Sequence, residues 1–146
     1  MTVASEGMLD TNILILRHLI DNALLPERSA ISAVVLGELA AGVHHVIPDR
    51  PDSHIVRADR MALLQQAEAE FDPVPYGAAA ARMYGRMSAA VVGLGRSPRA
   101  RTADLMIAAS AATEGLPLFT SNPDDYRGLA TLVGIVAVAR PNWKSV

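Results

Sequence analysis

The chain has 146 residues, 51% of them hydrophobic, and its 13 basic and 15 acidic residues leave a formal net charge of -2. This size and apolar content suit one domain with a hydrophobic core and exclude a disordered linker as a description of the whole. The slightly negative charge excludes a protein that coats nucleic acid through bulk positive charge. Because the chain has no cysteine, disulfides, thiolate nucleophiles and cysteine-ligated metal sites are excluded as well.

The first part of the chain predicts two short strands that each lead into a helix. Residues 7–9 form an apolar stretch typical of a buried strand. The Asp-Thr-Asn cluster at 10–12 predicts the start of a helix, because such side chains cap helix N-termini. A second strand is expected at 29–32. It leads into a helix from about 32 to 46, with Ser32 as the expected N-cap.

The rest of the chain alternates helices with short strands. Apolar spacing predicts three more helices, over 53–71, 76–92 and 102–113. Short strands are expected within 72–75, 116–120 and 133–138. From this order we predict a three-layer α/β fold, with a central and mostly parallel sheet flanked by helices. We expect one domain over residues 1–146.

Three acidic residues stand beside apolar stretches. Asp10 separates a predicted strand from a helix, Glu38 lies in the middle of a helix, and Asp104 precedes a run of apolar residues. A carboxylate removed from water is costly unless it is paired or bound to a cation. Since ligands bind at the carboxyl edge of open α/β sheets, the three acids can meet there. A divalent cation with oxygen ligands would relieve their repulsion.

Each of these acids also has a structural explanation. Asp10 can serve as a helix N-cap, and Asp104 can complement the dipole in the first turn of its helix. Glu38 can form a salt bridge with an arginine. These alternatives stay open at the level of the residues alone.

Four blocks of sequence together carry a family resemblance. They are Met8 to Asn12, the helical Glu38, Ala103 to Ala109, and Phe119 to Asn122 followed by Asp125 and Tyr126. In this order and spacing they resemble the PIN-domain ribonucleases, and within them the VapC toxins of bacterial toxin-antitoxin pairs. The resemblance runs from residue 8 to about 138. It implies a PIN-like fold, an acidic pocket that binds Mg²⁺ or Mn²⁺, and endonucleolytic hydrolysis of phosphodiester bonds in RNA.

The resemblance also implies roles for individual residues. Asp10, Glu38 and Asp104 correspond to the acids that hold the metal and carry catalysis. Thr11 would support the site through its hydroxyl, and Asn12 would orient its neighbours. The ion would activate water and neutralise charge on the phosphate, and Glu38 is our candidate for accepting the proton of that water.

The family often carries a fourth acid where this chain has Asn122. Asn122 can still offer a carbonyl oxygen, and Asp124 or Asp125 can supply the charge from the adjacent turn. Which of these residues takes the fourth position stays open, as does the binding of one ion or two. With three firm carboxylates, we expect one strongly held ion.

Three arginines precede the helix of Asp104. Arg96, Arg99 and Arg101 lie in a glycine- and proline-containing loop that could border the acidic pocket. Phosphate contacts from these arginines would position RNA without reading its sequence. The alternative is a solvated loop that binds nothing.

The resemblance implies partners as well. A small cognate antitoxin of the VapB kind is expected, in addition to the RNA substrate. A homodimer is also expected, for which the helices at 32–46 or 53–71 could provide the surface. The sequence shows neither a secretory signal nor an apolar stretch of membrane-spanning length, so we expect a cytoplasmic protein without a membrane partner.

Two other functions remain possible from the sequence. The replacement of the fourth acid by Asn122 would also suit a catalytically silent PIN-like domain that only binds a partner. Another Mg²⁺-dependent α/β phosphohydrolase could use Asp10. Dehalogenase-like phosphatases, however, need a second aspartate two residues later, where this chain has Asn12.

Overall fold

The computed structural model describes residues 4–141, so the ends of the expected domain 1–146 lie outside the described residues. Its strands are β1 (Glu6–Leu9), β2 (Arg28–Ala30), β3 (Leu118–Thr120) and β4 (Ile135–Ala137). Its α-helices are α1 (Thr11–Leu16), α2 (Ala33–His44), α3 (Ser53–Glu70), α4 (Ala78–Gly93) and α5 (Thr102–Thr113). Short 3-10 helices are η1 (Arg17–Leu19), η2 (Asn22–Leu24), η3 (Arg99–Arg101) and η4 (Pro123–Tyr126).

The four strands form one sheet in the order β2-β1-β3-β4, and every pair of neighbours is parallel. Met8 on the central strand β1 is in register with Ala30 on one side and Leu118 on the other. The predicted α/β fold with a parallel sheet is therefore confirmed. The strand expected within 72–75 is reduced to a single parallel bridge between Ser32 and Val74.

The predicted helix boundaries agree with the local capping chemistry. Ser32 caps α2 by accepting a hydrogen bond from the Val35 amide at 3.1 Å. Gly115 follows the C-cap of helix α5, and its φ of 67° suits a glycine just beyond the end of a helix. The amide of Leu116 bonds back to the carbonyl of Ala111, so β3 begins at residue 118 rather than at the predicted 116.

The core lies around the two central strands. Met8 and Leu9 on β1 and Phe119 on β3 are fully buried, as is Leu105 on α5. A Cβ at Gly7 would overlap the ring of Phe119, so glycine at this position allows the ring to lie against β1. This packing fixes the two strands whose carboxyl ends carry the candidate site.

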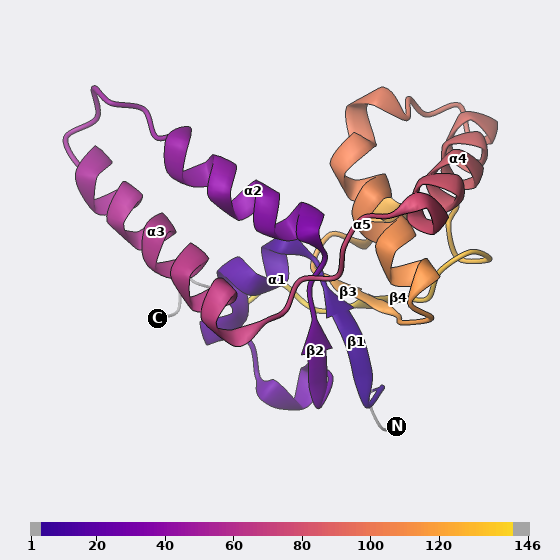
Figure 1. The fold of residues 1–146 in the computed structure, drawn as a ribbon, viewed down its shortest axis with the longest axis horizontal. Coiled ribbons are helices and arrows are strands. Elements are labelled where there is room, and N and C mark those ends of the chain that lie inside the picture. The colour runs from indigo at the N-terminus through magenta and orange to yellow at the C-terminus, as the bar shows by residue number, and fades with distance from the viewer. Residues whose placement is uncertain (1–3, 142–146) are drawn as a thin grey trace.

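Two helical lobes rise from the sheet. The α2–α3 hairpin forms one lobe and the α4–α5 pair forms the other, so the molecule has the outline of a V (Figure 1). The strands β1 and β3 point their carboxyl ends toward the base of this V. Residues that follow these strands are thereby placed between the lobes.

Candidate active site

The carboxylate of Asp10 lies at the end of β1 and is almost fully buried, with 3% of the residue exposed. Its Oδ1 accepts a hydrogen bond from the Thr11 amide at 2.9 Å, so Asp10 is also the N-cap of α1. Its Oδ2 accepts from the hydroxyls of Thr120 and Tyr126, both at 2.8 Å, and from Asn12 Nδ2 at 3.2 Å. Four donors therefore hold one side chain in place.

Asn12 connects the start of α1 to the segment that follows β3. Its Nδ2 donates to Asp10, and its Oδ1 accepts from the Ser121 amide at 3.0 Å. The Thr120 hydroxyl in turn accepts from the Asn122 amide at 3.0 Å. Side chains from two neighbouring strand ends thus form one hydrogen-bonded network around Asp10.

Glu38 differs from its sequence-based description. We expected it among apolar residues, but its side chain is exposed on α2, while Val35 and Leu39 are buried on another face of the helix. Its Oε1 accepts a hydrogen bond of 2.6 Å from the Thr11 hydroxyl, rather than from an arginine. Leu39 is the next residue in the chain, yet it points to a different side of α2, because adjacent residues in a helix do not share a face.

Asp104 lies in the first turn of α5 and is half-buried. The pKa of its carboxyl is raised to about 6, by burial first and then by the charges of Asp125, Asp10 and Glu38 in that order, against the opposing effect of Arg101. Four carboxylates therefore share one electrostatic environment. Arg101 opposes the effect of these acids on Asp104 only in part, because the pKa of Asp104 remains raised.

The three candidates for the fourth acid lie in different surroundings. The Oδ1 of Asn122 accepts a hydrogen bond from Arg140 at 3.1 Å. Asp124 forms ion pairs with Arg96 and with Arg127. Asp125 has only a 3.5 Å contact with Arg101, and among the charged neighbours it affects the pKa of Asp104 most. Asp125 is thus the candidate whose charge acts on Asp104.

The three arginines expected to contact RNA are not equivalent. Arg96 donates to the carbonyl of Asp124 at 2.8 Å, and Arg101 contacts Asp125. Arg99, in η3, is exposed and makes no side-chain hydrogen bond or ion pair within residues 4–141. Two of the three arginines are therefore engaged with acids that follow β3.

Thr120 and Tyr126 belong to the blocks that carry the sequence resemblance, which implies no role for either residue. Tyr126, in η4, is 2% exposed and its pKa is raised by burial and by the nearby charges of Asp10 and Asp104. The position of Thr120 at the end of a strand next to β1 could have identified it in advance. Nothing in the sequence pattern marks the hydroxyl of Tyr126.

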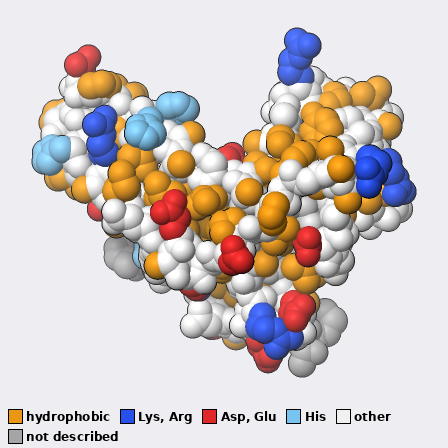
Figure 2. Space-filling view, in the orientation of Figure 1, with side chains coloured by type: hydrophobic (Ala, Val, Ile, Leu, Met, Phe, Trp, Pro, Cys, Tyr) orange, Lys and Arg blue, Asp and Glu red, His pale blue; other side chains and the backbone are white. Residues whose placement is uncertain are grey.

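The chemistry of this cluster suits a hard divalent cation. Its donors are carboxylate oxygens, which Mg²⁺ and Mn²⁺ prefer, and a cation would remove the repulsion that acts on Asp104. Within the described residues, no three histidine or acidic side chains are close enough together to hold an ion as they stand. In the space-filling view, the lobes flank a notch, and the basic side chains of this face lie mainly toward its margins (Figure 2).

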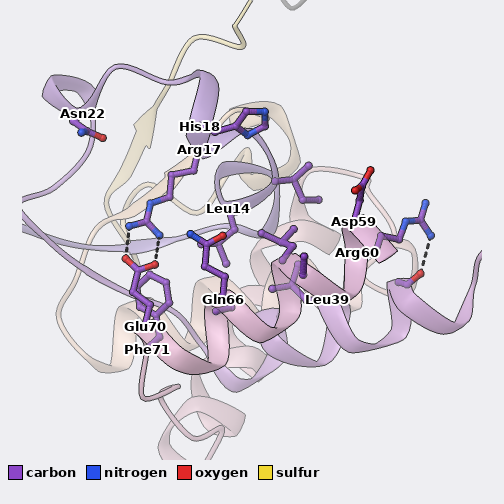
Figure 3. Close-up of a pocket in the computed structure, with 15 residues that line it drawn as sticks. Leu14, Arg17, His18, Asn22, Leu39, Asp59, Arg60, Gln66, Glu70 and Phe71 are labelled. Carbon is purple, nitrogen blue, oxygen red and sulfur yellow. Dashed lines mark hydrogen bonds and ion pairs between the residues drawn. The ribbon is translucent and has the colours of Figure 1, made fainter. Parts of the chain in front are cut away.

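A separate cavity of about 980 Å³ lies beside α1, between α2 and α3. Leu14, Leu39 and Phe71 give it apolar walls, and Arg17 pairs with Glu70 at one end (Figure 3). None of the four clustered acids lines this cavity. The acidic cluster and the cavity are therefore two distinct regions.

Comparison with known proteins places the chain in a family. The family model described as "PIN domain" matches residues 8–130. Ribonuclease VapC5 of Mycobacterium tuberculosis is 37% identical over 142 residues, which cover 94% of this chain and 98% of that protein.

Solved structures agree with this relationship. The crystal structure of VapBC-5 from Mycobacterium tuberculosis, a member of the VapBC family of toxin-antitoxin systems, contains a chain that is 33% identical. The match covers 92% of this chain and 98% of that one, with a TM-score of 0.74. A chain of VapBC2 from Rickettsia felis, bound to a DNA fragment from their promoter, shares the fold at 21% identity, with a TM-score of 0.67 and coverage of 91% and 98%. Within residues 4–141, no helix has the length and apolar character needed to cross a membrane.

Proposed function

Because this chain belongs to the PIN-domain family and is homologous to the VapC ribonucleases, we propose that it is the ribonuclease toxin of a toxin-antitoxin pair. It hydrolyses phosphodiester bonds in RNA, requires Mg²⁺ or Mn²⁺, and is neutralised by a cognate antitoxin of the VapB kind. The observation that carries the proposal is the half-buried Asp104, whose carboxyl is repelled by three other carboxylates at the carboxyl edge of the sheet.

Asp10, Glu38 and Asp104 are the residues that would hold the cation, and Asp125 would supply the fourth charge. Asp125 is favoured over Asn122 because the oxygen of Asn122 already accepts a hydrogen bond from Arg140. Glu38 is exposed and its side chain is held by one hydrogen bond within residues 4–141, so rotation of this long side chain can bring it toward the other acids. Such a rotation would gather the carboxylates more closely than they lie now.

In the reaction, the oxygen of a water molecule attacks the phosphorus, and the bond from phosphorus to the leaving ribose oxygen breaks. The bound cation would supply charge neutralisation at the phosphate and lower the pKa of the water. Glu38 is positioned by the Thr11 hydroxyl and open to solvent, so it can accept the proton that the water loses. Asp10 is buried and held by four donors, which suits a fixed ligand rather than a mobile base.

Arginines beside the cluster would hold the RNA backbone. Arg99 is exposed and free of side-chain partners within residues 4–141, so it can contact a phosphate directly. Arg101 has only long contacts with Asp125, and it can move to a phosphate when a cation takes over the charge of that acid. Arg96 is more firmly held by Asp124 and would contribute less.

The antitoxin part of the proposal is supported by the structural relatives. The chain at 33% identity comes from a VapBC complex, which is a toxin-antitoxin assembly. A homodimer stays a prediction.

The test is cleavage of structured RNA by the purified chain. With Mn²⁺ or Mg²⁺ we expect defined cleavage products, and with a chelator we expect intact RNA. Asp10→Ala and Asp104→Ala should abolish cleavage, while the exposed loop variant Asp72→Ala should cleave like the wild type. Expression of the chain alone should slow growth, and Asp104→Ala should relieve this effect.

Intact RNA under full metal loading would contradict the nuclease proposal. If the chain also bound its antitoxin equally well with and without Asp10 and Asp104, the silent binding module would be favoured instead. Cleavage that persists in Asp104→Ala would show that the chemistry lies elsewhere.

A further inference from the structure

The Oδ2 atom of Asp10 accepts an unusual number of hydrogen bonds. The hydroxyls of Thr120 and Tyr126 donate to it at 2.8 Å each, and Asn12 donates to it at 3.2 Å. A carboxylate oxygen offers about two lone pairs, so three donors leave none free. The other oxygen, Oδ1, accepts only the Thr11 amide at 2.9 Å within the described residues.

Tyr126 differs from the other donors because its hydroxyl makes a single contact. Thr120 also accepts the Asn122 amide, and Asn12 also bonds the Ser121 amide, so both have structural roles of their own. The hydroxyl of Tyr126 has the carboxylate of Asp10 as its one hydrogen-bond partner within residues 4–141. A phenylalanine would fill the same core space, so packing alone does not require this hydroxyl.

We propose that Tyr126 is a positioning residue, which saturates Oδ2 of Asp10 together with Thr120 and leaves Oδ1 as the one oxygen that Asp10 offers to a divalent cation. This inference rests on the proposed function. Partners that hydrogen-bond a metal ligand fix its orientation, and their removal commonly lowers metal affinity by about 10- to 100-fold. The hydroxyl acts through Asp10 and does not touch the reacting atoms.

The position of η4 in the fold supports this role. Asp125 and Tyr126 are adjacent residues of η4, so one short turn places a carboxylate near Asp104 and a hydroxyl on Asp10. A shift of this turn would change both at once. The site therefore depends on η4 as a unit, although the turn lies far from Asp10 in sequence.

The test is Mn²⁺ binding to the chain without RNA, measured by titration calorimetry and by the electron paramagnetic resonance signal of free Mn²⁺. We expect Tyr126→Phe to weaken Mn²⁺ binding about tenfold, with a folded circular dichroism spectrum. Tyr84→Phe is the matched control, because Tyr84 is partly buried on α4 and its hydroxyl makes no side-chain hydrogen bond within residues 4–141. This control should bind Mn²⁺ like the wild type.

A second pair of variants keeps the test independent of whether Tyr126→Phe folds. Thr120→Val removes the other hydroxyl at Oδ2 and should also weaken Mn²⁺ binding, whereas Thr120→Ser retains the hydroxyl and should restore it. A purely structural role would lower thermal stability in Tyr126→Phe or Thr120→Val and leave the Mn²⁺ affinity of the folded protein unchanged.

The outcomes separate this inference from the proposed function. If the wild type binds Mn²⁺ and Tyr126→Phe binds it equally well, the positioning role is wrong and the nuclease proposal stands. If neither the wild type nor any variant binds a divalent cation, the proposed function itself fails. Weakened binding in Tyr126→Phe and Thr120→Val, with normal binding in Tyr84→Phe and Thr120→Ser, establishes the inference.

Discussion

The acidic cluster between the lobes and the cavity beside α3 arrange their carboxylates in opposite ways. In the cluster, Asp104 faces other acids, which raise the pKa of its carboxyl together with burial. In the cavity, Glu70 accepts hydrogen bonds from Arg17, and this pairing lowers the pKa of the Glu70 carboxyl. The guanidinium of Arg17 also lies over the ring of Phe71, 5.5 Å from its centre.

This difference separates charges that cost stability from charges that contribute to it. A protein that holds several acids together without matching cations gives up free energy of folding, and such sites are typical of functional centres. The pair of Arg17 and Glu70 instead connects the segment after α1 to the end of α3. Removal of a charge should therefore have opposite effects on stability in the two regions.

The largest expected effect is on activity. We expect Asp104→Asn to lower the cleavage rate at least about 100-fold, because a lost metal ligand costs more than the loss of a residue that only orients one. Glu70→Gln should leave the rate within about twofold of the wild type. Both effects are measured as rates of RNA cleavage in excess Mn²⁺. Equal losses of rate in Asp104→Asn and Glu70→Gln would contradict the assignment of catalysis to the acidic cluster alone.

The next effect is the pH dependence of metal binding. With a pKa of about 6, Asp104 is ionised at pH 7 and mostly protonated at pH 5. Because the proton must leave before the carboxylate binds a cation, Mn²⁺ affinity should fall about tenfold between these pH values. Titration calorimetry at both pH values measures the change, and in Asp104→Asn the dependence should become shallower. A wild-type affinity that stays constant would contradict this assignment.

A smaller effect concerns the stability of the chelator-treated protein. The pKa of Asp104 is raised from 3.8 when the chain folds, so its ionised form opposes folding fully above about pH 6 and not below about pH 4. At pH 7.5, Asp104→Asn should raise the free energy of unfolding by about 1 kcal/mol, a value reduced for the solvent that screens a half-buried group. Urea unfolding measures this gain, which should disappear as the pH falls to 4.

The smallest effect lies in the cavity. Glu70→Gln should lower the free energy of unfolding by about 0.5 kcal/mol at pH 7.5, since the ion pair with Arg17 is partly exposed and screened. The pKa of Glu70 is lowered in the fold, so this contribution is present above its ordinary value of 4.5 and is lost as the pH falls through the lowered value. Added salt should reduce it further. A stability gain in Glu70→Gln would overturn the comparison.

Sequence patterns predicted the elements of the fold well, because capping residues and apolar spacing act over a few positions. Ser32 caps α2 as expected, and α5 covers the predicted residues 102–113. The limits of β3 were predicted less well. The end of α5 bonds Leu116, and this competition between a helix cap and a strand depends on the fold.

The candidate acids of the site and the family resemblance are both recognisable from the sequence alone. Asp10, Glu38 and Asp104 are recognisable because they stand next to apolar residues. Burying a carboxylate costs free energy unless it is paired or bound to a cation. The sequence did not determine how these residues are surrounded. Glu38 is exposed, and Asp125 has the largest effect on the pKa of Asp104 among the charged neighbours.

The side chains that hold Asp10 are brought together by the tertiary fold. The hydroxyls of Thr120 and Tyr126 come from residues more than a hundred positions away, and they reach Asp10 because β3 lies beside β1 and η4 turns back over the strand ends. Hydrogen bonds act over about 3 Å, whereas sequence patterns report on neighbours along the chain. The local chemistry of the acids is therefore readable from the sequence, and their positioning follows from strand pairing.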